Sequence, residues 1–215
     1  MKIQPEQPIR VALCIPSGDT VRLEFAVSMA AMVNRTHSTP HPLLEAIGII
    51  NLRSPVLPNS RERITNQALQ DGYTHLLWID SDMVFPNDSL LRLLAHGVEC
   101  VGVNAVRRSF PISFTAQTKP GEYLETRTES SGLEKVYRMG FGMLLIEAAA
   151  VRKIKKRPLF SLEWIGNQGI HRGEDFFFCG RLRKAGVTMY VDHDLTKEVG
   201  HVGSLTYYPS MGEKR

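Results

Sequence analysis

The sequence predicts an α/β fold with a mostly parallel central sheet flanked by helices, and three observations support this. In the first half, short apolar runs alternate with stretches of helical periodicity, the pattern of repeated β-α units. The third apolar run ends abruptly in two aspartates, at the kind of strand end where open α/β sheets present groups to a ligand. With 215 residues, 43% of them hydrophobic, the chain is long enough for one domain with a core of ordinary size.

The first half of the chain is predicted to follow the order β-α-β-α-β-α-β. Runs of apolar residues place strands at 11–16, 47–52, 75–79 and 100–105. Helical spacing places helices between them, at 20–34, 60–70 and 90–95. Thr20 or Asp19 is the expected N-cap of the first helix, and Gly72 and Gly97 follow the ends of the other two. Strands and helices that alternate in this way form parallel sheets covered on both faces.

The second half is less regular. Residues 106–135 are polar and glycine-punctuated, which predicts a mobile loop. Beyond this loop we expect further elements: a strand at 138–146, helices at 148–156 and 176–184, and a strand at 187–191. Because no internal repeat and no change of composition divides the chain, we expect a single domain over residues 1–215.

Composition and cysteine usage narrow the class of protein. The formal charge of +4 suits a polyanionic partner, and it suits phosphate-bearing small substrates equally. Three cysteines, Cys14, Cys100 and Cys179, lie in apolar settings without a CxxC pair, which indicates buried reduced thiols of a cytosolic protein. Residues 1–10 lack the apolar core of a signal peptide, and no apolar run reaches the roughly 18 residues that span a membrane. We therefore expect a soluble cytoplasmic protein with no membrane contact and no obligate protein partner.

The most informative motif is the pair Asp80 and Asp82, which follows the wholly apolar run Leu76–Ile79. Hard carboxylate oxygens suit Mg²⁺ or Mn²⁺, and these cations also bind the phosphates of a substrate. The pattern therefore points to an enzyme that handles a nucleoside diphosphate. A solvated turn after a strand is the alternative interpretation.

Two later motifs carry groups suited to chemistry. Glu174 and Asp175 follow Gly173 at the start of a predicted helix, where a carboxylate can take a proton from an acceptor hydroxyl or can simply be an ordinary first-turn acid. His201 lies between glycines in Gly-His-Val-Gly. A neutral imidazole there can complete a metal site with the aspartates, or it can be a satisfied loop histidine.

Several basic residues and one aromatic residue each allow two interpretations, a ligand contact or an ordinary surface position. Arg61 and Arg63 can clamp a diphosphate or a nucleotide base, or can lie on a solvated helix face. Arg107 and Arg108 follow a strand and can contact phosphate or plain solvent. The cluster at 153–157 is either a solvated helix end or a patch for nucleic-acid phosphates. Trp78 is expected in the core, whereas the loop residue Trp164 can stack on a sugar or a base.

Taken in order, these motifs resemble a GT-A fold glycosyltransferase of the compact type common in bacteria and their phages. The motifs that carry the resemblance are Val-Ala-Leu-Cys-Ile-Pro at 11–16, Trp-Ile-Asp-Ser-Asp-Met at 78–83, Gly-Phe-Gly-Met-Leu-Leu-Ile at 140–146, Gly-Glu-Asp-Phe-Phe-Phe-Cys at 173–179 and Gly-His-Val-Gly at 200–203. The resemblance covers roughly residues 9 to 205. It implies a single-domain, Rossmann-like GT-A fold, with a nucleotide-sugar-binding half at about 9–105 and an acceptor-side half at about 106–205.

The resemblance also implies roles for individual residues. Asp80 and Asp82 match the DxD signature that holds Mn²⁺ or Mg²⁺ on the diphosphate of a sugar nucleotide, with Asp82 as the direct ligand. Asp80 would face the ribose or the metal. Glu174 and Asp175 match the "ED" signature, whose Asp is the catalytic base in inverting members, and His201 matches the histidine that often completes the metal site. Retaining families share these signatures, so the anomeric outcome stays open.

Nucleotide contacts are implied at the ends of the first and third strands. Pro16, Ser17 and Asp19 match the segment that binds the base and ribose, and Ser81 lies between the two metal-binding aspartates. Arg61 falls where many members place a nucleotide-contacting arginine. The implied donor is a nucleotide sugar, with a UDP-sugar favoured. The loop at 106–135 is a candidate lid that excludes water.

The acceptor and two other function classes stay open. Small phage enzymes of this appearance include some that glycosylate hydroxymethylated pyrimidines in DNA, and the basic clusters at 107–108, 152–157 and 181–184 are compatible with a DNA acceptor whose base is flipped. A saccharide or cell-surface glycan is the alternative acceptor. A sugar nucleotidyltransferase is less favoured, because Ser17-Gly18-Asp19-Thr20 lacks a glycine run and a basic residue. A non-catalytic nucleic-acid-binding protein is the third class.

Overall fold

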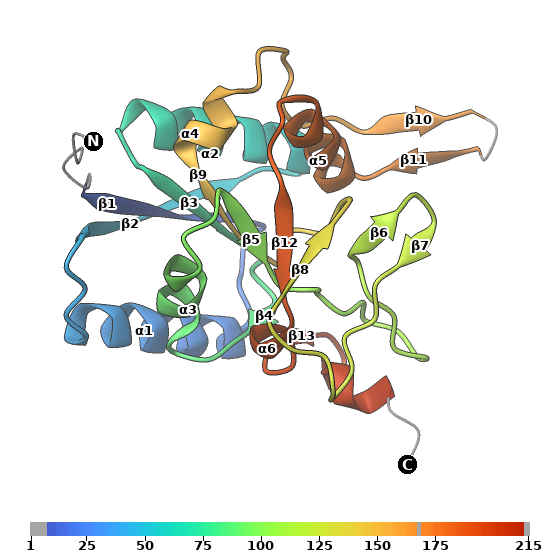
Figure 1. Ribbon diagram of the computed structural model, residues 1–215, viewed down its shortest axis with the longest axis horizontal. Coiled ribbons are helices and arrows are strands. Elements are labelled where there is room, and N and C mark those ends of the chain that lie inside the picture. The colour runs from blue at the N-terminus through green and yellow to red at the C-terminus, as the bar shows by residue number, and fades with distance from the viewer. Residues whose placement is uncertain (1–7, 167–168, 213–215) are drawn as a thin grey trace, which may run out of the picture.

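The computed structural model describes residues 8–166 and 169–212, and a seven-stranded sheet forms its centre (Figure 1). In spatial order the strands of this sheet are β2 (Leu44–Arg53), β1 (Ile9–Ser17), β3 (His75–Ile79), β9 (Met143–Glu147), β5 (Cys100–Gly102), β12 (Met189–Asp192) and β8 (Leu133–Val136). Helices cover both faces: α1 (Leu23–Ser38), α3 (Ser89–Ala95) and α6 (His193–Thr196) on one, and α2 (Leu57–Gln70), α4 (Ala148–Arg152) and α5 (Glu174–Lys184) on the other.

Smaller elements surround the main sheet. They are a three-stranded sheet of β4 (Met83–Val84), β13 (Gly200–Val202) and β14 (Thr206–Tyr207), the hairpins β6 (Gln117–Lys119)–β7 (Glu122–Tyr123) and β10 (Glu163–Ile165)–β11 (Ile170–Arg172), and the 3₁₀ turn η1 (Pro209–Gly212). Both hairpins extend from the side of the molecule that is formed by the second half of the chain (Figure 1). Among these additions, β4 directly follows β3, and β13, which carries His201, pairs with β4.

The expected α/β class with a mostly parallel sheet is confirmed. β1 pairs in parallel with both β2 and β3, and β5 pairs in parallel with β12. β9 runs antiparallel between β3 and β5, so those two strands point the same way. The carboxyl ends of β1, β3 and β5 therefore meet at one edge of the sheet, and β9 starts at that same edge.

Strand β3 is apolar throughout because both of its faces are covered. Its alternate residues divide between two cores: Leu76 and Trp78 pack toward α2, α4 and α5, whereas Leu77 and Ile79 pack toward α1 and α3. All four side chains are fully buried. This explains why an uninterrupted apolar run precedes the aspartates at the edge of the sheet, and it confirms the core position of Trp78.

Several expected boundaries are wrong. The helix expected at 20–34 begins at Leu23 after an N-cap residue, Arg22, that makes no side-chain cap, so neither Thr20 nor Asp19 caps it. Asp19 instead forms an exposed ion pair with Arg53. The helix expected at 148–156 ends at 152, the strand expected at 138–146 begins at 143, and the strand expected at 100–105 ends at 102.

The segment 106–135, where a mobile loop was expected, has a hydrogen-bonded frame. It contains β6 and β7 and leads into β8. The side chain of the buried Asn104 connects two parts of this segment. Its amide nitrogen donates to the Leu124 carbonyl at 2.8 Å, and its amide oxygen accepts the Ala116 N–H at 2.9 Å. Trp164 lies in β10, where a loop was expected, and the residue is 59% exposed.

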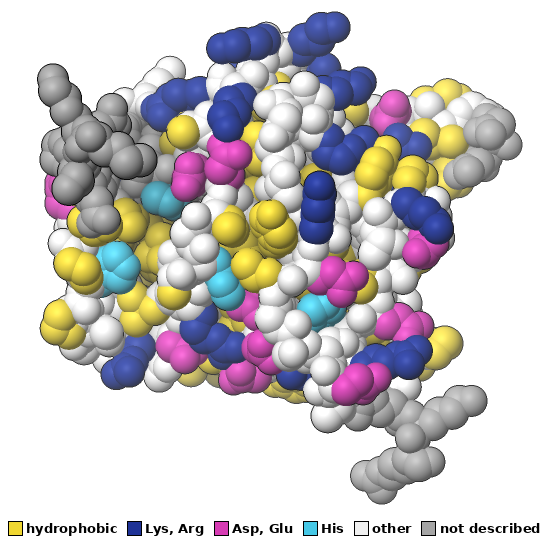
Figure 2. All heavy atoms as spheres, in the orientation of Figure 1, with side chains coloured by type: hydrophobic (Ala, Val, Ile, Leu, Met, Phe, Trp, Pro, Cys, Tyr) yellow, Lys and Arg dark blue, Asp and Glu magenta, His cyan; other side chains and the backbone are white. Residues whose placement is uncertain are grey.

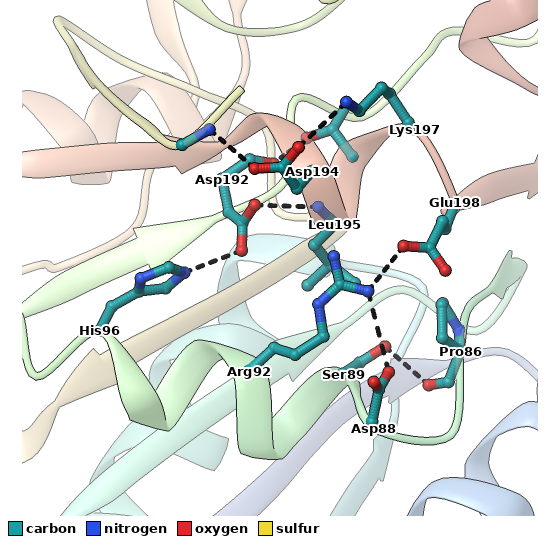
Figure 3. Close-up of polar contacts among 12 residues, drawn as sticks. Pro86, Asp88, Ser89, Arg92, His96, Asp192, Asp194, Leu195, Lys197 and Glu198 are labelled. Carbon is teal, nitrogen blue, oxygen red and sulfur yellow. Dashed lines mark hydrogen bonds and ion pairs between the residues drawn. The ribbon is translucent and has the colours of Figure 1, made fainter. Parts of the chain in front are cut away.

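A polar network joins α3 to α6 and fixes the segment that leads to β13 (Figure 3). His96 Nε2 lies 2.8 Å from Asp192 Oδ2, and the other oxygen of Asp192 accepts the Leu195 N–H at 2.9 Å, which caps α6. Arg92 donates to Glu198 at 2.7 Å. Since β13 begins only two residues after Glu198, these contacts set the position of the strand that carries His201.

The prediction of buried, unpaired thiols is confirmed. Cys14, Cys100 and Cys179 are free and fully buried, and burial raises the pKa of Cys179 to about 12. Such thiols are protonated and unreactive at neutral pH. Across the described ranges, the structure has no helix that is both long enough and apolar enough to cross a membrane.

Candidate active site

One cavity of about 280 Å³ brings together residues from six separate segments at the carboxyl edge of the sheet. Its lining includes Asp80, Arg108, Phe141, Asp175 and His201. Three of the predicted site residues therefore meet in one place. A larger cavity of about 540 Å³ between residues 125–129 and η1 holds none of them, and we do not place the chemistry there.

The turn after β3 places Asp82 beside His201. The Met83 N–H donates to the Asp80 carbonyl at 3.2 Å, which closes the turn, and β4 then pairs with β13 so that Met83 lies opposite His201. The Val202 N–H donates to the Asp82 carbonyl at 2.7 Å. The two predicted metal ligands, which are 119 positions apart in the sequence, are thus held on adjoining backbone segments.

Asp82 and His201 face each other with two acceptor atoms. His201 Nδ1 lies 2.8 Å from the Val106 carbonyl, which only accepts, so this nitrogen carries the proton. In the neutral ring Nε2 is then an acceptor, and it lies 3.3 Å from the acceptor Asp82 Oδ1. Two acceptors at this distance require a proton or a metal ion between them. A histidine fixed by a backbone carbonyl through its other nitrogen is the usual arrangement of a metal ligand.

The charges of this pair reinforce each other. Burial raises the pKa of Asp82, but the hydrogen bond and charge of His201 and the charge of Arg108 outweigh burial, and the net pKa is lowered. Burial lowers the pKa of His201, but its bonds to Asp82 and Val106 outweigh that, and the net pKa is raised. Asp82 is therefore a carboxylate at neutral pH, as a ligand of a hard cation must be.

Arg61 lies beneath the cavity and connects two of the predicted site residues. Its Nη2 donates to Asp80 Oδ1 at 2.8 Å, and its Nε donates to Glu174 Oε1 at 3.1 Å. Its Cζ lies 4.8 Å from the ring centroid of Phe141 and 5.3 Å from that of Trp78. The side chain is only 2% exposed, so its interpretation as part of a solvated helix face is wrong. A direct contact with a nucleotide stays a prediction.

Glu174 and Asp175 are adjacent but do different things. Glu174 points inward to Arg61, whereas Asp175 lines the cavity. Asp175 Oδ1 accepts the Phe176 N–H at 2.6 Å, and Gly173 permits this because a Cβ there would lie 2.7 Å from that oxygen. Burial and the charge of Glu174 raise the pKa of Asp175 to about 6. Burial also raises the pKa of Asp80, although Arg61 opposes this.

The predicted nucleotide-binding residues follow β1 and β3. Pro16 is buried near the end of β1, and Ser17 Oγ accepts from the Asn51 amide at 2.8 Å. Asp19 is exposed and forms an ion pair with Arg53. The Ser81 carbonyl accepts the Arg22 N–H at 3.3 Å. None of these four lines the cavity that holds Asp80 and Asp175, so their contact with a nucleotide stays a prediction.

Some residues of the site were not assigned a role from the sequence. Phe141 covers the Arg61 guanidinium, the Val106 carbonyl orients His201, and Gly142 accepts the Asp80 N–H at 3.2 Å. At Gly142 a Cβ would lie 2.7 Å from that of Ala105, so only glycine lets these backbones approach so closely. The Gly-Phe-Gly run was a visible signal of close approach, but nothing local pointed to what lies against it.

The donor set can be tested against the divalent cation that the DxD resemblance implies. Within residues 8–166 and 169–212, no three His, Cys, Asp or Glu side chains converge as a metal cluster, since Asp80 is turned toward Arg61. Asp82 and His201 provide two ligands. Such a partial set fits an ion that takes its remaining ligands from water and from the phosphates of a substrate.

No protein-family model and no curated protein sequence matches the chain. Similar solved structures do exist. The crystal structure of A197 from STIV matches with a TM-score of 0.62 and 20% identity over 94% of this chain and 92% of that one. A mutant of Drosophila β1,4-galactosyltransferase 7, in complex with manganese, UDP-Gal and xylobiose, matches with 0.52 and 16% over 91% and 71%. TarS 1-349 of S. aureus matches with 0.50 and 12% over 86% and 58%.

At these identities the similarity concerns the fold. The match to A197 spans nearly the whole of both chains. The galactosyltransferase belongs to the class that the DxD and Glu-Asp motifs resemble. The chain therefore has the GT-A fold of these glycosyltransferases.

Proposed function

We propose that the protein is a metal-dependent glycosyltransferase that moves a sugar from a nucleoside-diphosphate sugar to an acceptor hydroxyl. One observation carries this proposal. A single cavity collects Asp80, Asp175 and His201 from three distant segments, with Asp82 held against His201. These are the residue types that donor binding and proton removal require, and they meet on a GT-A fold.

Asp82 and His201 are the proposed metal-holding residues. A divalent Mn²⁺ or Mg²⁺ held by these two residues would offset the negative charge that develops on the leaving diphosphate. The manganese and UDP-Gal in the similar galactosyltransferase support a UDP-sugar donor. Asp80 is proposed to orient the sugar-nucleotide donor, because the hydrogen bond from Arg61 to its Oδ1 fixes the carboxylate. Pro16, Ser17, Asp19 and Ser81 are proposed to contact the nucleotide.

Asp175 is the proposed general base. The Phe176 N–H fixes one of its oxygens, and within the described part of the chain the other oxygen has no hydrogen-bond partner, so it is available for the proton of the acceptor hydroxyl. A pKa of about 6 suits this role, because the base is ionised at neutral pH and still has a useful affinity for a proton. Glu174, which Arg61 holds, is proposed to keep the helix start in position.

The second part of the proposal concerns the identity of the acceptor. The clusters at 152–157 and 181–184 meet in one basic patch, Lys153, Lys155, Lys156, Arg181 and Lys184. In Figure 2 the Lys and Arg side chains gather at the top of the view, over α4 and α5. The patch lies at the far end of α5 from Asp175, and Lys184 is about 13.5 Å from Asp175 along the helix at 1.5 Å per residue.

This patch supports a polyanionic acceptor, and we propose the hydroxymethyl group of a modified pyrimidine in DNA. The phosphates would lie on the patch and a flipped base would reach Asp175. Exposed Trp164, in the hairpin directly before Asp175, favours a saccharide acceptor instead, since its ring can stack on a sugar. The three buried reduced thiols support a cytoplasmic location, in a bacterial host if a phage encodes the chain.

The first experiment measures donor turnover and acceptor modification together. The protein is incubated with Mn²⁺, a panel of UDP- and GDP-sugars, and either hydroxymethylcytosine-containing duplex DNA, unmodified duplex DNA or an oligosaccharide. We expect nucleoside diphosphate release with one donor and a mass gain of one sugar on one acceptor. A mass gain of one sugar on the oligosaccharide would indicate that the acceptor is a glycan. Pyrophosphate release from a nucleoside triphosphate would indicate a nucleotidyltransferase. Metal-independent, salt-sensitive DNA binding without turnover would indicate a non-catalytic nucleic-acid-binding protein.

Matched variants connect the activity to the cavity. Asp82→Asn and Asp175→Asn each remove one carboxylate and should abolish transfer. Asp71→Asn makes the same change at an exposed position at the end of α2 and should leave transfer intact. Full activity in Asp82→Asn would refute the proposal.

A further inference from the structure

Arg108 is a cation of the site that the proposed function does not yet use. Its Nη1 lies 2.9 Å from Asp82 Oδ2. The other oxygen of the same carboxylate, Oδ1, faces His201 Nε2 at 3.3 Å. Both oxygens of the proposed metal ligand are therefore engaged, one by a histidine that can also bind the metal and one by a guanidinium that cannot.

The structure delivers the Arg108 side chain to this position through two local features. The segment that carries it folds back on itself, because the Arg107 N–H donates to the Ser113 carbonyl at 2.8 Å and Val106 bridges to Phe114. The side chain then passes over Gly203, where a Cβ would lie 3.1 Å from Arg108 Cδ. Glycine at this position leaves the space through which Arg108 reaches Asp82.

Arg108 also lines the cavity that Asp80 and Asp175 share, and 47% of its side chain is exposed. It can therefore leave Asp82 without losing a buried environment. A guanidinium presents several N–H donors in a plane, a geometry that matches the oxygens of a phosphate group. The carboxylate partner and a diphosphate are thus alternative anions for the same side chain.

We propose that Arg108 is a built-in counter-ion that occupies Asp82 until a divalent cation binds, and that it then moves to the diphosphate of the donor. The inference rests on the proposed function, because it takes Asp82 as a metal ligand and a nucleoside diphosphate as the donor group. A divalent cation held between Asp82 Oδ1 and His201 would lie close to the guanidinium on Asp82 Oδ2, and because these two positive charges repel each other, metal binding displaces Arg108. The displaced guanidinium stays beside the cavity, where it would bind the negatively charged diphosphate of the donor.

This exchange predicts opposite effects of one substitution on two affinities. Removing Arg108 frees Asp82 and removes a positive charge next to the metal, so the metal alone binds more tightly. The same change removes a donor to the diphosphate, so the nucleotide binds less tightly once the metal is present. A merely structural role for Arg108 would weaken both.

The test compares the intact wild-type chain with Arg108→Gln in two binding measurements. The electron paramagnetic resonance signal of free Mn²⁺ gives the metal affinity without nucleotide, and calorimetry gives the UDP affinity at saturating Mn²⁺. In Arg108→Gln we expect Mn²⁺ to bind about two- to fivefold more tightly, the range of an exposed ion pair. We expect UDP to bind about tenfold more weakly, the lower range for a charge-assisted hydrogen bond.

Arg127→Gln is the control, because Arg127 forms a more exposed ion pair with Glu125, at 2.7 Å, that does not line the cavity. It should leave both affinities unchanged. Unchanged or weaker Mn²⁺ binding in Arg108→Gln, with wild-type thermal unfolding, would overturn the proposal, and so would an unchanged UDP affinity. Asp82→Asn separates this failure from that of the proposed function. If Asp82→Asn binds Mn²⁺ as well as wild type, or if the wild type binds none, the metal site itself is wrong and both proposals fall.

Discussion

Replacing Asp175 by Asn should make the protein more stable at neutral pH while removing its activity. The pKa of this carboxyl is raised from 3.8 to about 6, chiefly by burial and then by the charge of Glu174. In the unfolded chain the group ionises near its ordinary value. The native state therefore holds the proton more tightly than the unfolded state does, and ionisation costs free energy of folding.

The sign and size of the effect follow from these two pKa values. Below about pH 4 the carboxyl is protonated in both states and costs nothing. The cost builds up between about pH 4 and 6 and stays constant above that, at no more than about 3 kcal/mol, since one pKa unit is worth about 1.4 kcal/mol. Because the side chain is partly open to the cavity, solvent screening reduces the expected value to about 1–2 kcal/mol.

The assay is urea unfolding at pH 4.5, 5.5, 6.5 and 7.5 with EDTA present, followed by the fluorescence of tryptophan, including the buried Trp78. Asn at position 175 keeps an oxygen for the Phe176 N–H, so the local backbone contact survives. We expect Asp175→Asn to gain stability relative to wild type as pH rises, with an unchanged denaturant slope. Asp71→Asn should show no such trend. A gap that is flat with pH, or one that shrinks, would refute the reasoning.

Three further predictions follow from the same geometry. The value of kcat/KM should rise with pH through about 6 as Asp175 ionises, and a profile that is flat from pH 5 to 8 would contradict its role as the base. Asp82→Asn should weaken Mn²⁺ binding at least tenfold without changing thermal stability by more than a few degrees, and retained Mn²⁺ affinity would exclude Asp82 as a ligand. Arg61→Met should destabilise the fold by about 3–5 kcal/mol, since two carboxylates lose a buried partner; denaturant unfolding measures this, and a loss below about 1 kcal/mol would show that the bridge is unimportant.

The parts of the fold that could be predicted are those that local pattern determines. The apolar run of β3 and the two aspartates after it are neighbours in sequence, so burial on both faces and exposure at the edge are visible together. The direction of β9 was not visible, because strand direction depends on which edge of the sheet the preceding chain reaches. The start of α1 was misplaced for a similar reason: Arg22, the residue before it, donates its N–H to the Ser81 carbonyl, a contact across the sheet edge.

The site shows the same division. The sequence marked Asp80, Asp175 and His201 by residue type and spacing, and the structure places all three in one cavity. The sequence could not show that Glu174 and Asp175 point in different directions, because both occupy the first turn of one helix. Nor could it show the burial of Arg61, because the partner that removes this arginine from solvent lies 113 positions away.

The bridge made by Arg61 has a consequence for how the proposed enzyme can diversify. One guanidinium binds a carboxylate from each half of the chain, so the turn after β3 and the start of α5 are locked to each other. The hairpins β6–β7 and β10–β11 extend from the periphery, outside this lock (Figure 1). We expect these hairpins to behave as exchangeable modules. In the proposed glycosyltransferase, replacement of these hairpins would change the acceptor, whereas the residues that Arg61 joins would stay the same.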